Sequence, residues 1–274
     1  MTDVGPPRYG TIDTDYAARL ATTAPEDDGP VWMVNLMRYR EVADYADGRE
    51  STLSGREADD LYTPLESLAG VGAEIAFVAD VQDQFLNDSP PWDRVAVVRY
   101  PTRRAFIEMQ SRPDFQRQHV HKDAGMAETF VIGCQPMPKP DAGLEHVDWA
   151  GVPHPPTDED GPVVVVHVVR FEEAVAAGTS PEDMDAYSTA AAQVALPHGA
   201  RVDGWFGVEG TIVGDGRTWD QVRFNAFPSR AAFLAVVADP ARLEAQRAHR
   251  ETAIADTYTL VTRPMINRLA ESVD

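Results

Sequence analysis

The sequence contains one pattern twice. Residues 92–101 read WDRVAVVRYP, and residues 219–228 read WDQVRFNAFP. Each stretch has Trp-Asp, an alternating run, an aromatic residue and a proline, and each is followed by an Ala-Phe pair four residues later. A repeat constrains the fold strongly, because each copy is expected to build the same supersecondary unit. The chain is therefore predicted to contain two copies of one α+β unit.

The parallel extends to the end of each copy. The stretch 121–137 aligns without a gap with the stretch 249–265, and both run from a His-basic pair to Pro-Met. The order of strand and helix signals predicts β-α-β-β-α-β in each copy, with the second helix split. We expect an N-terminal extension with a short helix over 1–28, repeats over 29–137 and 161–266, a proline-rich linker over 138–160 and a tail over 267–274.

The predicted sheets need a cover on one face. A βαββαβ sheet carries its helices on one side only, and the other side must be buried by another layer. The second copy is the obvious cover. The fold prediction is therefore an α+β protein with two tandem ferredoxin-like repeats, which build within one chain the α/β barrel that single-repeat proteins build by dimerising. A cavity is expected between the two sheets.

Composition limits the classes of function. With 274 residues, of which 43% are hydrophobic, the chain can form two cores. A net charge of −20 argues against binding to nucleic acid or to an anionic membrane. Cys134 is the only cysteine, so no intramolecular disulfide can form. The sequence has neither a signal peptide nor a long apolar run, and a cytoplasmic location is predicted.

The candidate site follows from strand alternation, because every second residue of a strand lies on the same face. In the second copy, the repeated motif is expected to form a strand. One face of this strand consists of Trp219, Gln221, Arg223, Asn225 and Phe227. The other face consists of Val222, Phe224 and Ala226. The apolar face is expected under the helices, which predicts that the polar face lines the cavity between the sheets.

The two copies differ at three positions on this predicted cavity face. His167 stands where the first copy has Asn35, and Arg223 and Asn225 stand where it has Ala96 and Val98. Buried polar groups cost free energy unless they are paired. One interpretation is a hydrogen-bonded cluster or an Arg223–Asp203 ion pair that stabilises the barrel. The other is a site for a ligand.

In the functional interpretation, His167 titrates near neutrality and acts as general acid or base. Arg223 holds an anionic group, and Asn225 donates to a developing oxyanion. Further candidates for substrate contact are Trp219, Gln221, Asp203, Trp205, Asn35, Trp92 and Arg94. The sequence has no motif for a metal, a nucleotide or a flavin, and no cofactor is expected.

Several stretches resemble the DUF1330 family, a branch of the dimeric α/β-barrel superfamily. In the first copy they are residues 35–39, 92–106, 113–116 and 121–122, and in the second 219–220, 227–233, 239–240 and 249–250. The resemblance covers most of residues 30–137 and 162–265 and implies the fold. Members of the superfamily share a cavity and not a chemistry. They include haem-binding relatives of chlorite dismutase, which leaves haem ligation by His121 or His249 as an alternative.

The functional hypothesis is a small-molecule enzyme. It would perform cofactor-independent acid/base chemistry, such as isomerisation or cyclisation through an enolate, on an aromatic or polyketide-like anion. A cofactor-free monooxygenase acting on an activated phenol is a related hypothesis. The alternative from another class is a non-catalytic binding or structural protein. Pairing of two such chains into a homodimer is left open.

Overall fold

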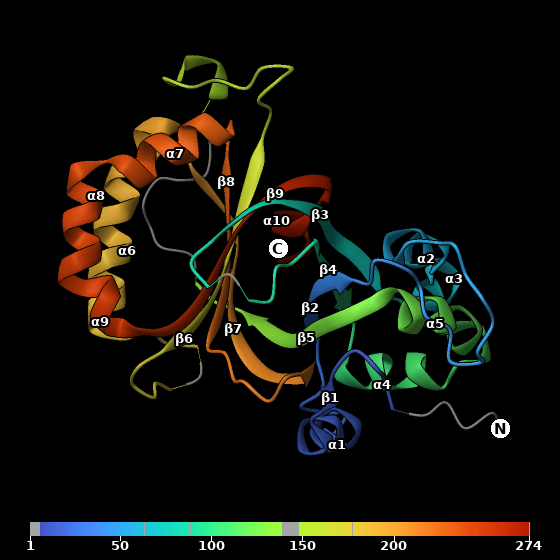
Figure 1. Cartoon of the computed structure of the whole chain (residues 1–274). Coiled ribbons are helices and arrows are strands. Elements are labelled where there is room, and N and C mark those ends of the chain that lie inside the picture. Colours follow the sequence, from blue (N-terminus) through green and yellow to red (C-terminus); the bar gives the residue numbers. More distant parts are fainter. Residues whose placement is uncertain (1–5, 63, 88, 139–147, 177, 274) are drawn as a thin grey trace. The chain divides into compact units, whose positions relative to one another are not determined.

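A computed structural model describes residues 6–62, 64–87, 89–138, 148–176 and 178–273 (Figure 1). The chain divides into two compact units that combine strands with helices. Unit 1 comprises Met1–Val78, Pro91–Cys134 and Gly210–Thr218. Unit 2 comprises Ala79–Pro90, Gln135–Glu209 and Trp219–Asp274. Each unit therefore includes a short segment from the other copy of the repeat. Residues 139–147 of the predicted linker lie outside the described residues.

In unit 1, strand β2 lies antiparallel between β4 and β5, and β3 follows β4. Its strands are β1 (Thr11–Ile12), β2 (Val31–Tyr39), β3 (Glu74–Phe85), β4 (Arg94–Tyr100) and β5 (Met126–Pro136), of which β3 and β5 continue beyond the unit. Its helices are α1 (Thr14–Thr22), α2 (Gly55–Leu61), α3 (Leu65–Gly70), α4 (Arg103–Ser111) and α5 (Pro113–Gly125).

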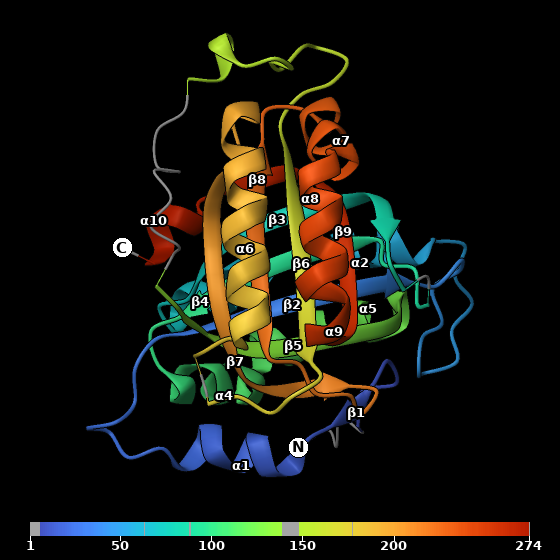
Figure 2. The same cartoon turned by 90° about the vertical axis from the view of Figure 1, so that its left-hand side faces the viewer.

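In unit 2, β6 lies antiparallel between β8 and β9, and β7 pairs with β8. The strands are β6 (Val163–Phe171), β7 (Arg201–Gly214, whose end belongs to unit 1), β8 (Gln221–Phe227) and β9 (Ile254–Asn267). The helices are η1 (Trp149–Gly151), α6 (Glu182–Ala195), η2 (Leu196–His198), α7 (Arg230–Ala238), α8 (Pro240–Ala245), η3 (Gln246–Arg250), α9 (Glu251–Ala253) and α10 (Leu269–Val273). Figure 2 shows α6 and α8 side by side over one face of this sheet. Among the described residues, no helix is long and apolar enough to cross a lipid bilayer.

The two units have the same strand order. Counted within each copy, the fourth strand lies beside the first, the first beside the third, and the third beside the second. Local signals recur as well. Thr102 and Ser229 cap α4 and α7 by accepting a hydrogen bond from the backbone N–H three residues later, at 3.0 and 3.1 Å. Proline is the first residue of both α5 and α8. The mixed α+β architecture with antiparallel strands is as predicted.

The helices of unit 2 cover the face of the sheet opposite to the predicted one. Val163, Val165 and Phe227 pack against Phe233 of α7, and His167, Arg223 and Asn225 lie on this same helix-covered face. Strand alternation grouped these residues correctly, but their predicted place in a cavity between two sheets is wrong. The cause is that both faces of the strands are buried, so hydrophobicity did not distinguish the face that the helices cover.

The described part of the linker is tied to unit 2. The indole N–H of Trp149 donates to the carbonyl of Gly199 at 2.8 Å, and the guanidinium of Arg201 lies 4.2 Å from the Trp149 ring centroid. The Asp160 carboxylate accepts hydrogen bonds from the first backbone N–H groups of α7, at 2.8 and 2.9 Å. The end of the linker thus fixes the start of a helix that lines the candidate site.

We expect Leu36→Ala to lower the free energy of unfolding by about 2–5 kcal/mol, because Leu36 is fully buried in the central strand of unit 1. Leu61→Ala is the matched control. Leu61 is 47% exposed, so its loss is expected to cost at most about 0.5 kcal/mol. Urea unfolding of the two variants measures both values. Equal losses would contradict the assignment of β2 to the core.

Candidate functional site

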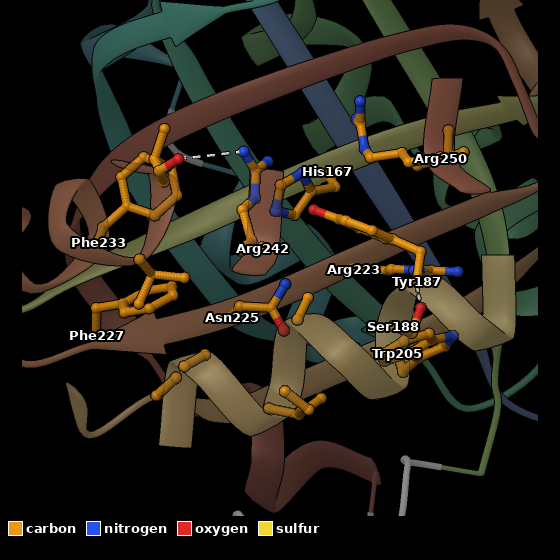
Figure 3. A pocket seen from close by; sticks show the side chains of 18 of the residues that line it. His167, Tyr187, Ser188, Trp205, Arg223, Asn225, Phe227, Phe233, Arg242 and Arg250 are labelled. Carbon is orange, nitrogen blue, oxygen red and sulfur yellow. Dashed lines mark hydrogen bonds between the residues drawn. The ribbon is translucent and has the colours of Figure 1, made fainter. Parts of the chain in front are cut away.

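A pocket lies between the sheet and the helices of unit 2 (Figure 3). Side chains of β6, β7 and β8 form its floor, and α6, α7, α8 and η3 form its walls. Its volume is about 130 Å³. Figure 3 shows Phe227 and Phe233 together at one end, and Trp205, Ser188 and Arg223 at the other. The pocket therefore has a pair of phenylalanines at one end and Arg223 with Trp205 at the other.

Arg223 is held in place by neutral partners. Its Nε donates to Oε1 of Gln221 at 2.8 Å, and its Nη2 donates to the same oxygen. Nη1 donates to Oγ of Ser188 at 3.1 Å, and the guanidinium lies 4.0 Å from the ring centroid of Trp205. Gln221 is fixed in turn by the carbonyl of Thr179, to which it donates at 3.0 Å. Three of the five N–H groups of Arg223 are used, and two remain for a ligand.

Three further arginines line the pocket, of which Arg201 forms an ion pair with Asp203 at 3.2 Å. Arg250 is 8% exposed and, among the described residues, makes neither a hydrogen bond nor an ion pair. Arg242 donates one hydrogen bond, to the carbonyl of Val237 at 3.3 Å. None of the described residues that line the pocket is Asp or Glu. Burial lowers the pKa of Arg223 to about 9, which leaves it charged at neutral pH, and the negative charge of Asp185 opposes this shift. Burial also lowers the pKa of Arg250, against the opposing effects of Tyr187 and Glu251. Arg223, Arg242 and Arg250 thus lie around one cavity whose described lining residues include no carboxylate.

His167 lies directly opposite Arg223 in the pairing of β6 with β8. Its Nδ1 is 3.2 Å from Oγ1 of Thr259 on the other neighbouring strand. Burial, followed by the positive charges of Arg250, Arg223 and Arg242, lowers the pKa of His167 to about 3. The expectation that this histidine titrates near neutrality is therefore wrong for the empty pocket, where it is neutral at pH 7.

The predicted ion pair between Arg223 and Asp203 does not form. The Asp203 carboxylate instead accepts from Nε of Arg201 at 3.2 Å and from Nδ2 of Asn267 at 2.6 Å. The pairing of β7 with β8 shifts between Val202 and Gly204. The extra residue in this β-bulge breaks the alternation, so Asp203 leaves the face that Trp205 shares with Arg223.

Asn225 lies in the pocket as well, opposite Val165, and its side chain makes no hydrogen bond among the described residues. The structure therefore brings His167, Arg223, Asn225 and Trp205 together, as the repeat comparison suggested. Their proposed roles stay predictions.

The two tryptophans of the repeated motif do not line this pocket. Trp219 packs against Tyr258 with ring centroids 5.4 Å apart, and Trp92 packs against Phe130 at 4.8 Å in unit 1. Tyr258 lies opposite Val168, on the face of the sheet turned away from His167. The proposed role of the tryptophans as flat walls of the site is therefore wrong for this pocket, and the shared Trp-Asp motif is part of the scaffold.

Asn35 and Arg94 belong to unit 1, and neither lines the pocket. Asn35 accepts a hydrogen bond from Nζ of Lys122 at 3.4 Å. Arg94 forms an ion pair with Asp59 at 3.0 Å, and Asp59 also accepts from the Tyr39 hydroxyl at 2.7 Å. The positive charge on this face of unit 1 is thus partly offset by a buried carboxylate.

Sequence reasoning missed the residues that the helices contribute. Tyr187 and Ser188 come from α6, Arg242 from α8 and Arg250 from η3. Only the repeat alignment carried a signal, because Arg250 aligns with the basic residue Lys122. Figure 3 shows the Tyr187 hydroxyl pointing toward the side of the pocket that holds His167 and Arg242.

The recurring histidines lie outside the pocket. Nδ1 of His121 is 2.8 Å from the Tyr45 hydroxyl, and Nδ1 of His249 is 2.8 Å from the Asp183 carboxylate. Both therefore fasten a helix to a neighbouring segment of its own unit. In the part of the chain that the structure describes, no group of three or more His, Cys, Asp or Glu side chains is placed to hold a metal ion.

No protein-family model matches the chain, and no curated protein matches it. Three solved structures illustrate what it is similar to. A protein of unknown function from Rhodopseudomonas palustris is 23% identical, with a TM-score of 0.41 over 48% of this chain and 98% of that one. A mutant chlorite dismutase from Candidatus Nitrospira defluvii is 13% identical, with a TM-score of 0.48 over 90% and 96%. A proposed monooxygenase from Lactobacillus acidophilus is 10% identical, with a TM-score of 0.40 over 88% and 97%.

The stability of the protein is expected to depend on pH through His167. The pKa of His167 is about 3 in the folded chain and about 6.5 in an unfolded one, so between these values the unfolded chain binds one more proton. The folded state should lose about 1.4 kcal/mol for each pH unit below about 6. His167→Gln removes this loss. Urea unfolding of both proteins at pH 7, 6 and 5 measures it, and parallel curves for the two would show that His167 is protonated normally.

Proposed function

We propose that unit 2 binds a small aromatic anion in this pocket. One observation carries the proposal: of the four arginines that line the cavity, only Arg201 forms an ion pair among the described residues, and no described lining residue is a carboxylate. Desolvated charges of one sign are costly unless a partner neutralises them, and a bound carboxylate or phenolate would do so through charge-assisted hydrogen bonds. The aromatic end, with Phe227 and Phe233, supplies apolar surface for the remainder of the ligand.

The size of the pocket favours a ligand with one ring. A protein cavity of about 150 Å³ accepts benzene, and the volume here is about 130 Å³. A benzoate-like or phenylpyruvate-like acid suits this space better than a polyketide with several rings. The carboxylate would lie toward Arg223 and Arg250, with the ring toward Phe227.

The chemistry that this arrangement supports is proton transfer that depends on the ligand. Burial, and after it the positive charges of Arg250, Arg223 and Arg242, lower the pKa of His167. A bound anion offsets their charge and so raises the pKa of the imidazole. His167 would then accept a proton from the carbon next to a carbonyl group, and the electron pair would move onto the carbonyl oxygen as an enolate. Arg223 and the Asn225 amide would stabilise that oxygen.

The alternative function is binding without catalysis. It uses the same arginines and the same aromatic end, and it differs only in whether His167 exchanges a proton with the ligand. The two functions are therefore separated by a measurement of proton transfer and not by affinity.

Binding is tested first, with benzoate and with benzamide, its neutral analogue, by isothermal titration calorimetry. We expect benzoate to bind and benzamide to bind at least 10-fold more weakly. Arg250→Gln should weaken benzoate binding by about 10- to 100-fold, the range of a charge-assisted hydrogen bond. It should change the melting temperature of the protein without benzoate little, because among the described residues Arg250 loses neither a hydrogen bond nor an ion pair, only the contact of its guanidinium with the Tyr187 ring at 5.9 Å.

Arg247→Gln is the matched control, because Arg247 is exposed on the same helical turn and does not line the pocket. It should leave benzoate binding unchanged. Failure of the wild type to distinguish benzoate from benzamide would contradict an anion site.

Catalysis is tested with phenylpyruvate, a one-ring acid with exchangeable protons beside its keto group. In deuterated buffer the wild type is expected to exchange these protons faster than buffer alone, as followed by NMR. His167→Gln should lower the enzymatic exchange by about 100-fold or more while the affinity for benzoate stays within about threefold. Exchange at the buffer rate with intact binding would favour the non-catalytic function.

The finer description of the fold also belongs to the proposal. The equal strand order of the two units and their equivalent helix caps support an origin by duplication of one ferredoxin-like repeat. We propose in addition that the chain belongs to the DUF1330 family and that its two repeats form an intrachain barrel of the dimeric α/β type. The cytoplasmic location and the pairing of two chains stay predictions.

A further inference from the structure

The alignment of the two repeats contains a one-residue insertion in the second copy. Pro113 and Pro240, the first residues of equivalent helices, are 127 positions apart. His121 and His249, near the ends of the same helices, are 128 positions apart. Unit 2 therefore has one extra residue between Pro240 and His249.

The extra residue is absorbed within the helix. In unit 1, α5 is a regular helix of 13 residues. In unit 2, the equivalent segment is α8, then a π-helical turn over Gln246–Arg250, then α9. The backbone N–H of Glu251 bonds to the carbonyl of Gln246, five residues earlier. Proline starts both helices, and the strands that follow them pair in the same register with a shift at the same place, so the insertion cannot be absorbed at either end.

The π-helical turn keeps the side chains before it and after it on the same face of the helix. Phe115 and Lys122 are seven residues apart, which in an α-helix at about 100° per residue places them on the same face. Arg242 and Arg250 are eight residues apart, which a regular helix would place about 80° apart. Both nevertheless line the pocket, because the wider turn takes up the additional residue.

The middle of the turn places no side chain in the pocket of unit 2. In unit 1, His119 fills the space between Phe115 and Lys122: its ring centroid is 5.2 Å from that of Phe115, and its Nε2 is 2.8 Å from the Tyr9 hydroxyl. In unit 2, neither Gln246 nor Arg247 lines the pocket. Gln246 donates instead to the Glu251 side chain at 3.2 Å, and Arg247 is exposed.

We propose that this π-helical turn is the positioning element that opens the pocket of unit 2 and sets its selectivity for anions. The insertion removes the inward-facing side chain from the middle of the helix and keeps a guanidinium at each edge of the gap. This inference rests on the proposed function for the identity of the ligand. The origin of the cavity is independent of that function.

Deletion of Ala248, which is exposed in the turn, tests the inference. It restores the helix length of unit 1 and shortens the spacing from Gln246 to Arg250 from four residues to three, while Gln246 stays four residues after Arg242. His119 has these same spacings to Lys122 and Phe115. A crystal structure should show a regular helix with the Gln246 side chain in the former pocket. Benzoate binding should fall at least 10-fold, and Gln246→Ala added to the deletion should recover most of it.

Gln246→Ala in the full-length chain is the control and should leave benzoate binding within about twofold. If the Ala248 deletion prevents folding, as judged by thermal unfolding, deletion of Arg247 is the second variant, because it places Gln246 at the same position. A structure in which the deletion keeps the cavity open would overturn the inference whether or not benzoate binds. If the wild-type protein does not bind benzoate, the anion site is contradicted. The crystal structure of the deletion variant would still test the origin of the cavity.

Discussion

Positive charge buried without a carboxylate is the constraint that distinguishes unit 2 from unit 1. A desolvated guanidinium is costly when it stands alone, and several around one cavity repel each other. In unit 1, the positive charge of Arg94 is neutralised by its ion pair with Asp59. Unit 2 has Gln221 at the position of Arg94, and a neutral amide oxygen accepts the hydrogen bonds of Arg223. In unit 2 the charges of Asp185 and Glu251 offset those of Arg223 and Arg250 only from outside the lining of the pocket.

The position of the site under the helices follows from how the strands are buried. Val164, Val166 and Val168 form a purely apolar face of β6, and each is at most 2% exposed. The opposite face carries His167 and meets α6 and α8, whose long side chains reach across the cavity. A sheet–helix interface therefore supplies what a face made only of valines lacks: side chains from several elements that converge on one polar group.

Much of the architecture could be predicted from the sequence because it depends on local signals. The repeated motif and the order of strand and helix signals identified the elements, and strand alternation correctly grouped His167, Arg223 and Asn225. The covered face could not be predicted, because both faces are apolar enough to be buried. The displacement of Asp203 depended on a single-residue bulge, which alternation cannot reveal.

The low pKa of His167 could not be predicted either, since it depends on arginines from helices that are distant in sequence. The one-residue insertion, by contrast, is visible in the sequence as a change of spacing from 127 to 128 residues. Its structural consequence could not be predicted from the sequence, because an extra residue can form a loop, a bulge or a wider turn. Only the fixed ends of the helix determine which of these forms.

In the proposed function, the charge of the ligand controls the reaction as well as the binding. The arginines that would attract a carboxylate also add to the effect of burial in lowering the pKa of His167. A neutral molecule of the same shape would fill the cavity and leave those charges in place, so the imidazole would stay a weak base beside it. An anion neutralises them and activates the base in the same event. Selectivity at the chemical step can therefore exceed selectivity in affinity, because the charge that secures the ligand also determines whether proton transfer can begin.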